Sequence, residues 1–299
     1  MNMLEVSGLQ KSFGDKKVLK GLDMTVSEGS IFGFIGKNGA GKTTAMKAVL
    51  GLIQADGGEI RVNGEKAVYG QTDTNRHIGY LPDVPEFYGF MTAREYLRFC
   101  GEITGHEDKY IRSRSDELLS LVGLDKERHR IKGYSRGMKQ RLGIAQALLS
   151  RPKLLICDEP TSALDPVGRK EILDIISSLK GETTVVFSTH ILSDVERICT
   201  DVAFLSDGVI SVQGKLEEVK AKYRRDEYSI ETESVEVAAD LLSVSPYLKP
   251  ESETGVSFSE KDISLFEVLE IIKNKKISFA KFEKKEPTLE SLFLEVAGK

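Results

Sequence analysis

A glycine-rich stretch, Gly-Lys-Asn-Gly-Ala-Gly-Lys-Thr at residues 36–43, constrains the fold more than any other feature of the sequence. It fits the pattern G-x-x-x-x-G-K-[ST], in which backbone amides surround phosphate groups. The apolar residues 31–35 before it predict a short buried strand, and Met46, Val49 and Leu50 after it predict the apolar face of a helix. A strand, such a loop and a helix in this order predict an α/β fold with a phosphate-binding loop.

The chemistry of this loop predicts a nucleoside triphosphate as the ligand. Its glycines let amides approach phosphate oxygens without Cβ clashes, and the helix N-terminus adds the positive end of its dipole. Lys42 would reach the β- and γ-phosphates, the Thr43 hydroxyl would bind Mg²⁺, and Thr44 would help to hold the α-phosphate. A chance match is the alternative, and the flanking strand and helix argue against it. The predicted nucleotide-binding residues of the loop are Gly36, Asn38, Gly39, Ala40, Gly41, Lys42, Thr43 and Thr44.

A second apolar run, residues 154–157, is predicted as a strand and ends in Asp158 and Glu159. A carboxylate at the end of a buried strand beside the loop can hold Mg²⁺ through water, which is the role expected for Asp158. The next carboxylate, Glu159, can orient or deprotonate the attacking water. Strands also end in acidic residues without any function, so this assignment depends on the other motifs of the chain.

Five further segments occur in the chain order of the ATP-binding-cassette (ABC) ATPases, and residues 3–214 as a whole resemble that family. The segments are KSFGDKKVL, IGYLPDVPEFYGFMTAREYL, YSRGMKQRLGIAQALL, SALD and VVFSTHILSDVERIC. They resemble, in that order, the adenine-stacking segment, the Q-loop, the signature with its helix, the D-loop and the switch strand. A GTPase is the competing P-loop class, but the DxxG match at residues 165–168 has no NKxD downstream to bind guanine.

The resemblance implies an ATPase with ATP and Mg²⁺ as ligands and with Lys42, Glu159 and His190 as catalytic residues. Phe13 would stack on adenine, which needs only a flat apolar face, and Val18 would line the same site. Phe13 could instead be a core aromatic and His190 a structural histidine. The place of His190 directly after a predicted strand favours a position near the γ-phosphate.

The Q-loop departs from the family pattern at Asp83, where glutamine is usual. A carboxylate can still reach Mg²⁺ directly or through water, so Asp83 is predicted as a metal ligand together with Thr43 and Asp158. It adds negative charge beside the phosphates and cannot donate a hydrogen bond when ionised. The alternative is that Asp83 is only a turn residue before Val84.

The signature also departs from the family pattern, because it reads Tyr-Ser-Arg-Gly-Met at residues 134–138 instead of Leu-Ser-Gly-Gly-Gln. Ser135 and Gly137 remain, and in the family these two contact phosphate. The serine can cap the following helix, Gly137 lets an amide approach closely, and Arg136 adds positive charge. We interpret the stretch as functional. The same form resembles a branch of bacterial exporter ATPases that includes antibiotic-resistance and sodium-efflux types.

In the family the signature faces the loop of a second subunit, so the resemblance implies an ATP-dependent dimer of this chain with two buried ATPs. Ser135 and Gly137 would then act on the ATP of the partner copy. The helical subdomain expected at about residues 90–150 would dock, with the Q-loop, on a separately encoded membrane permease. The competing interpretation of this region is a plain helical insertion.

Composition excludes some classes of protein. The chain has 299 residues and a formal net charge of −4, which does not support a nucleic-acid partner. The three cysteines are far apart without a CxxC, a pattern that suits a reducing cytosol. No apolar run approaches the about 18 residues that cross a membrane. The expected location is cytoplasmic, on the inner face of the cell membrane through the permease.

After Gly214 the sequence changes character. Residues 1–214 are expected to form the ATPase domain and residues 215–225 a charged helical connector. Residues 226–299 should form a small α+β accessory domain in which strand and helix alternate three times, without a catalytic constellation. The predicted strand positions are Tyr228, Ile230, Thr232, Val256, Phe258, Ile277 and Phe279. The predicted helix positions are Ile263, Phe266, Leu269 and Ile272, and then a final helix from Pro287-Thr288 with Leu289, Leu292, Phe293 and Val296.

The resulting prediction is an ATP-hydrolysing subunit that powers an exporter. A regulatory ABC ATPase that is not coupled to transport is the alternative from another class, but relatives of that kind usually carry two cassettes, a coiled-coil insertion or basic arms. A module that binds nucleotide and hydrolyses it poorly, and an importer subunit, are further rivals. The transported substrate is not encoded in this chain.

Overall fold

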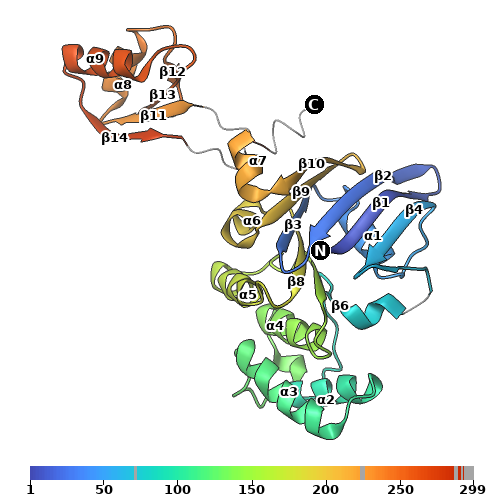
Figure 1. The fold of residues 1–299 in the computed structure, drawn as a ribbon. Coiled ribbons are helices and arrows are strands. Elements are labelled where there is room, and N and C mark those ends of the chain that lie inside the picture. Colours follow the sequence, from blue (N-terminus) through green and yellow to red (C-terminus); the bar gives the residue numbers. More distant parts are fainter. Residues whose placement is uncertain (71–72, 223–225, 286–288, 291, 293–299) are drawn as a thin grey trace. The chain divides into compact units, whose positions relative to one another are not determined.

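The glycine-rich loop lies between strand β3 (Ile31–Gly36) and helix α1 (Lys42–Val49), as the sequence predicts. The computed structural model describes residues 1–70, 73–222, 226–285, 289, 290 and 292. The chain divides into two compact units, the larger containing Met1–Val219 and the smaller Lys220–Leu292. The expected α/β fold is confirmed (Figure 1).

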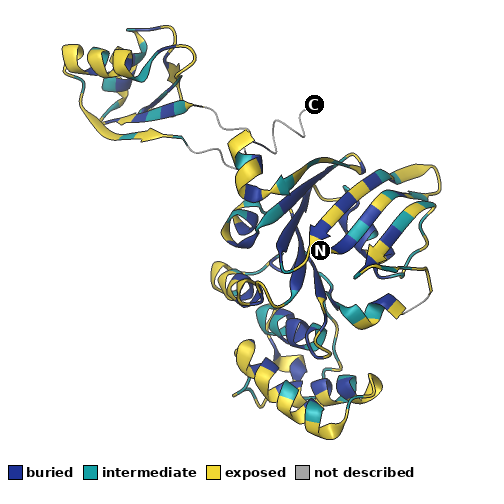
Figure 2. Ribbon diagram, viewed as in Figure 1, coloured by how far each residue is buried: buried dark blue, intermediate teal, exposed yellow. Residues whose placement is uncertain are grey.

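The larger unit is built on a six-stranded sheet whose strands are parallel except at one edge. All residues of β3, β7 and β8 are buried, which agrees with their continuous apolar runs (Figure 2). In spatial order the strands are β10 (Val209–Lys215), β9 (Asp201–Ser206), β3, β8 (Thr184–Thr189), β7 (Leu154–Asp158) and β6 (Ile78–Leu81). Only β10 runs antiparallel to its neighbour. The carboxyl ends of β3, β7 and β8 therefore meet at one edge of the sheet.

A second, antiparallel sheet shares its apolar core with the first. Its strands are, in spatial order, β2 (Lys16–Ser27), β1 (Asn2–Phe13), β4 (Gly57–Val62) and β5 (Glu65–Lys66). Helix α1 lies between the two sheets, since it contacts β2 and β4 as well as β3 and β7. Met46 and Val49 of α1 are buried there together with Leu22 and Phe34. This packing fixes α1 with its first turn directly after the loop.

Helix α6 (Leu192–Ile198) packs on β3 and β8 at close range. A Cβ on Gly33 would lie 2.8 Å from Val195 Cγ1 and 3.1 Å from Cys199 Sγ, so only glycine fits at this contact. Helix α5 (Pro166–Ser178) packs beside α6 and is capped by the Asp165 side chain. None of the helices in the described part of the chain is long and apolar enough to cross a membrane.

Three helices between β6 and β7 form the expected helical region. They are α2 (Ala93–Ile103), α3 (Asp108–Leu121) and α4 (Arg136–Ala147), and they contact one another in pairs. A capping box between Thr92 and Glu95 starts α2, and the Ser135 hydroxyl caps α4. The α4 stripe of Leu142, Ala145 and the following Leu149 is buried, as predicted.

The smaller unit alternates strands and helices as the sequence predicts. Its elements are β11 (Glu227–Thr232), α8 (Val235–Leu242), the short β12 (Lys249–Pro250), β13 (Gly255–Ser259), α9 (Leu265–Lys275) and β14 (Phe279–Lys284). The sheet order is β12-β13-β11-β14, and all pairs are antiparallel. Tyr228, Ile230, Val256 and Phe258 are buried in its core. The helix α7 (Leu216–Lys222) agrees with the predicted helical connector.

Two details predicted for this unit are wrong. Phe266 and Leu269 lie in α9 as predicted, but they are 78% and 40% exposed, since the buried face of the helix carries Val268 and Ile272, and Ile263 precedes the helix. The strand β14 starts at Phe279, which is 41% exposed, so Ile277 precedes the strand. A register shift opposite residues 231 and 232 changes the alternation and turns Phe282 toward the core.

The predicted final helix lies partly outside the described residues. Leu289 and Leu292 are helical and buried. Pro287, Thr288, Phe293 and Val296 lie outside the described residues.

Candidate functional site

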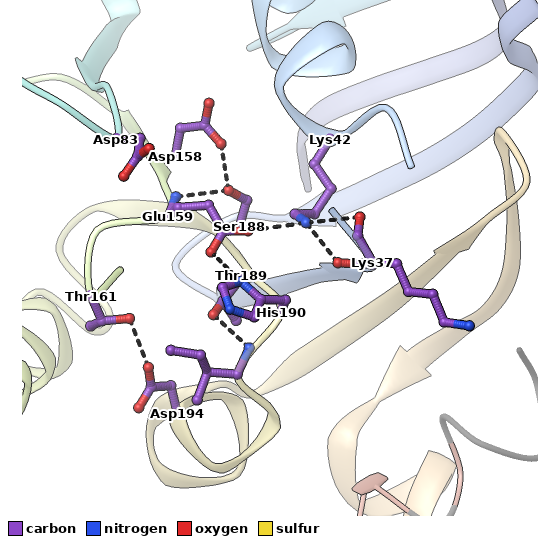
Figure 3. Close-up of polar contacts among 12 residues, drawn as sticks. Lys37, Lys42, Asp83, Asp158, Glu159, Thr161, Ser188, Thr189, His190 and Asp194 are labelled. Carbon is purple, nitrogen blue, oxygen red and sulfur yellow. Dashed lines mark hydrogen bonds and ion pairs between the residues drawn. The ribbon is translucent and has the colours of Figure 1, made fainter. Parts of the chain in front are cut away.

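The carboxyl edge of the six-stranded sheet brings the loop, the acidic strand end and the switch histidine together. Lys42 follows β3 across the loop, Asp158 and Glu159 end β7, and His190 follows β8. The register places Asp158 beside Ser188 and Ile35 beside Thr189. Residues separated by more than 100 positions in the sequence thereby form one polar cluster (Figure 3).

Lys42 is buried at the centre of this cluster, with its side chain 5% exposed. Its ammonium donates a hydrogen bond to the Gly36 carbonyl at 2.6 Å and forms an ion pair with Glu159 Oε1 at 3.0 Å. The loop conformation that holds it needs glycine at Gly41, where φ is +111° and a Cβ would lie 2.9 Å from Leu19 Cδ2. The Lys42 ammonium is therefore held inside the glycine-rich loop, at a position where it could bind phosphate oxygens.

Glu159 lies between two positively charged or proton-carrying groups. Its Oε1 faces Lys42, and its Oε2 lies 2.8 Å from Nδ1 of His190 (Figure 3). The backbone of Glu159 has φ +48°, a left-handed conformation that a non-glycine residue adopts at an energetic cost. A hydrogen bond from its amide to Ser188 Oγ, at 3.0 Å, helps to hold this conformation. Oε1 is buried, and the Lys42 ammonium is the group that faces it.

Asp158 is held by two hydroxyl groups. Thr43 Oγ1 donates to Oδ2 at 2.7 Å, and Ser188 Oγ donates to Oδ1 at 2.8 Å. The carboxylate is 3% exposed, and Ser188 was not predicted as a site residue. The sequence feature that could have indicated Ser188 is its position on the predicted switch strand, one residue before the strand ends. The pair of Thr43 and Asp158 is the predicted Mg²⁺ site.

The donor set fits Mg²⁺ that is bound with a phosphate ligand. Thr43 and Asp158 offer hard oxygen atoms 2.7 Å apart, and Mg²⁺ usually combines one or two protein oxygens with phosphate and water. Within the described ranges, no group of three or more His, Cys, Asp or Glu side chains could hold a metal by itself. Phosphate oxygens and water would complete the coordination.

A pocket of about 530 Å³ opens over this cluster. Phe13 lines it and is 53% exposed, as a stacking surface requires. The other lining residues are Lys16, Val18, Asn38, Gly39, Gly41, Lys42, Thr43, Thr44, Asp83, Glu159, Ser162 and His190. Lys16 and Ser162 were not predicted, although both stand in family-like segments of the sequence. Phe13 and the loop thus flank one cavity.

Five predicted site residues do not line this pocket. Gly36 contributes the carbonyl that accepts from Lys42, and Asp158 lies behind Thr43. Ala40 lines a neighbouring cavity of about 300 Å³. Ser135 and Gly137 lie at the start of α4, where the Ser135 hydroxyl accepts a hydrogen bond from the Met138 amide at 3.2 Å.

Asp83 joins the pocket from the helical side of the unit. Its pKa is raised chiefly by burial, and also by the nearby Asp158 and Glu159 carboxylates, while Arg136 lowers it. Arg136 Nη2 lies 3.3 Å from Asp83 Oδ1. The sequence singled out both residues as departures from a family pattern but gave no sign that they meet.

A second buried carboxylate supports the site from behind. Asp194 in α6 is 1% exposed and accepts from Thr161 Oγ1 at 2.8 Å and from Arg169 Nε at 2.6 Å. It links the helix after His190 to the segment after Glu159 (Figure 3). No sequence motif considered above indicated this residue.

Comparison with known proteins agrees with this geometry. Residues 19–162 match the family described as ABC transporter, and residues 214–297 match the C-terminal domain of DrrA1-3-like ATP-binding proteins. The chain is 38% identical over 304 residues to the ABC transporter ATP-binding protein YxlF of Bacillus subtilis, covering 98% of this chain and 99% of that protein. It is 40% identical over 226 residues to the bacitracin transport ATP-binding protein BcrA of Bacillus licheniformis, covering 75% of this chain and 73% of that protein.

Solved structures of the same kind resemble the chain. An ATP-binding subunit of an ABC transporter has a TM-score of 0.67 at 31% identity and covers 74% of this chain and 93% of its own. CbiO1 from Clostridium perfringens, described as part of the ABC transporter complex cbiONQ, has a TM-score of 0.68 at 26% identity and covers 82% of this chain and 96% of its own.

Proposed function

Because this chain belongs to the ABC transporter family of ATP-binding proteins and has the ATP-hydrolysing domain of that family, we propose that it powers a separately encoded membrane permease as an exporter subunit. The observation that carries the catalytic part is the cluster of Lys42, Glu159 and His190 beside Thr43 and Asp158. The family establishes ATP as the nucleotide. Export, the dimer and the roles of individual residues are proposals.

In the proposed reaction the Lys42 ammonium exchanges Glu159 for the β- and γ-phosphates. Glu159 Oε1 then accepts a proton from the water that attacks the γ-phosphorus, and the bond from that phosphorus to the β–γ bridging oxygen breaks. His190 donates a hydrogen bond to a γ-phosphate oxygen. The buried Oε1 atom, 3.0 Å from the Lys42 ammonium, and the 2.8 Å contact of Oε2 to His190 support these roles.

Thr43 and Asp158 would hold Mg²⁺, with Asp83 within the same pocket as a further oxygen ligand. When bound, the ion neutralises negative charge on the phosphates. The two hydroxyl donors on Asp158 keep this carboxylate oriented toward the loop. Phe13 would present its ring to adenine at the other end of the pocket.

We propose that Ser135 and Gly137 bind the ATP of a second copy of this chain. They start α4, whose N-terminal dipole favours an anion, and they do not line the pocket described above. Two copies arranged head to tail would place each signature over the other ATP. Residues 1–214 are the proposed cassette, 215–225 its connector and 226–299 an accessory domain.

The surface beside Asp83 is the proposed docking site for the permease. A groove of about 430 Å³ is lined there by Asp83, Val84, Pro85, Glu86, Phe87, Gly89, Ile131, Arg136 and Lys139. Val84, Tyr88 and Phe90 are 61%, 51% and 63% exposed, although they are apolar or aromatic. Such a patch is typical of a protein contact and would hold the chain at the inner face of the membrane.

The export direction rests on the resemblance of residues 134–138 to the signature of an exporter branch. It is tested by uptake into inverted membrane vesicles from cells that co-express the chain with a candidate permease. Exported compounds should accumulate inside such vesicles when ATP is added. ATP-dependent loss from preloaded inverted vesicles would instead indicate an importer.

The dimer is tested with Glu159→Gln, which should bind ATP but not hydrolyse it. Light scattering with MgATP is expected to report twice the mass found without it. The double variant Glu159→Gln/Ser135→Arg should remain a monomer, because a bulky side chain at the signature blocks the partner phosphate. Dimers of equal stability in both variants would contradict the proposed role of Ser135.

A further inference from the structure

Asp83 and Arg136, two side chains that depart from the family pattern in the Q-loop and in the signature, line the same groove and contact each other. Arg136 Nη2 donates to Asp83 Oδ1 at 3.3 Å. The two side chains are 44% and 47% exposed, so the ion pair alone contributes little to stability. Its main effect is that the Arg136 guanidinium offsets the negative charge of the Asp83 carboxylate.

Two further contacts hold the segment around Asp83 on the same helix face. Gln140 is fully buried and donates from Nε2 to the Asp83 carbonyl at 2.6 Å. Gly143 packs so closely that a Cβ there would lie 2.5 Å from Leu81 Cδ1. Arg136, Gln140 and Gly143 are spaced i, i+4 and i+7 and therefore share one face of α4. Gln140 therefore holds the Asp83 backbone, Gly143 packs on Leu81 two residues earlier, and Arg136 holds the Asp83 carboxylate.

This carboxylate stands at a position where negative charge is already dense. Asp83 lines both the nucleotide pocket and the groove beside it. Glu159 lines the same pocket, and Arg136 is paired with Asp83. A triphosphate in the same pocket would add further repulsion.

We propose that Arg136 is a positioning residue that holds the Asp83 carboxylate and offsets its charge beside bound MgATP. The Asp83–Arg136 ion pair then takes the place of the glutamine and the glycine that are usual in the family at these two positions. The charge of each residue is needed to balance the charge of the other. This inference rests on the proposed binding of MgATP in the pocket lined by Asp83. It assigns to Arg136 a function within its own subunit, apart from any contact with a partner.

The test is a double-mutant cycle at Asp83 and Arg136. The affinity of each full-length variant for MgATPγS, which is hydrolysed slowly, is measured by isothermal titration calorimetry. Arg136→Gly is expected to weaken binding about three- to fivefold, because the Asp83 charge is no longer offset. Adding Asp83→Gln to that variant should restore the affinity to within about twofold of the wild type, because the glutamine carbonyl oxygen can still ligate Mg²⁺ and no charge remains to be offset. Arg136→Lys, which keeps the charge, should bind as the wild type does. Arg136→Gln replaces the glycine variant if the latter does not fold.

Lys139→Gln is the matched control, because it removes a positive charge from the same groove without a contact to Asp83. Its affinity should stay unchanged. An equal loss in Lys139→Gln, or a double variant no tighter than Arg136→Gly, would overturn the proposal. The second result would place the effect of Arg136 on another anion, such as the ATP of a partner copy. A wild-type chain that does not bind MgATPγS would instead overturn the proposed function on which the inference rests.

Discussion

The Lys42 ammonium lies 3.0 Å from Glu159 Oε1, so the residue expected to bind phosphate is paired with the residue expected to act as the base. The two side chains are only 5% and 13% exposed, which limits screening by water. Nucleotide binding must therefore compete with Glu159 for Lys42. Glu159 is free to accept a proton only once Lys42 has exchanged it for phosphate.

Glu159→Gln should consequently tighten the binding of ADP as well as stop hydrolysis. Loss of the carboxylate charge frees Lys42 for the β-phosphate, and we expect an affinity gain of about three- to tenfold, on the order of 1 kcal/mol. The measurement is titration with MgADP, which lacks the γ-phosphate expected at the dimer interface. An ADP affinity equal to that of the wild type would show that the ion pair does not oppose binding.

Asp194→Ala should strongly destabilise the larger unit. The change leaves the Thr161 hydroxyl and the Arg169 guanidinium without the acceptor that both use, and we expect a loss of about 2–4 kcal/mol in the free energy of unfolding. Urea denaturation followed by circular dichroism measures it. Asp174→Ala is the control, because it removes an exposed pair with Arg197 and should cost less than about 1 kcal/mol. Similar losses in both variants would contradict a special role for the buried carboxylate.

Gly33→Ala should destabilise the chain through overpacking. The new Cβ would lie 2.8 Å from Val195 Cγ1, so α6 must move away from β3 at a cost of about 1–3 kcal/mol. Gly133→Ala has open space around the new methyl group and should change stability by less than about 0.5 kcal/mol. Thermal denaturation of the two variants side by side checks the difference, and equal midpoints would count against the tight contact.

The buried thiols should resist alkylation in the native protein. Burial raises the pKa of Cys157 and of Cys199 far above the usual range, so almost no thiolate forms at pH 8. Iodoacetamide should label the partly exposed Cys100 first, and more slowly than a free thiol, because partial burial also raises its pKa. Mass spectrometry of labelled peptides, with a urea-unfolded sample as the reference, measures the rates. Rapid native labelling of Cys157 would mean that β7 opens readily.

The α/β fold, the family and the order of strands and helices could be predicted without the structure, because they depend on local patterns. The glycine loop from Gly36 to Thr43, the apolar run ending at Asp158 and the alternation at Tyr228 and Ile230 each lie within a few residues. The start of a helix is also a local feature where a side chain caps it, as Ser135 caps α4. The start of α9 could have been read from its capping box, since Ser264 and Glu267 are three residues apart.

The pairing of polar groups that are far apart in the chain could be read only from the folded protein. Ser188 with Asp158, Thr161 with Asp194, and Arg136 with Asp83 are pairs separated by 30 to 53 positions. These pairs arise because parallel strands place their carboxyl ends at one edge and because α4 packs on the loop after β6. A polar side chain in isolation satisfies its hydrogen bonds with water, so its partner appears only when packing excludes that water and leaves one neighbour in reach.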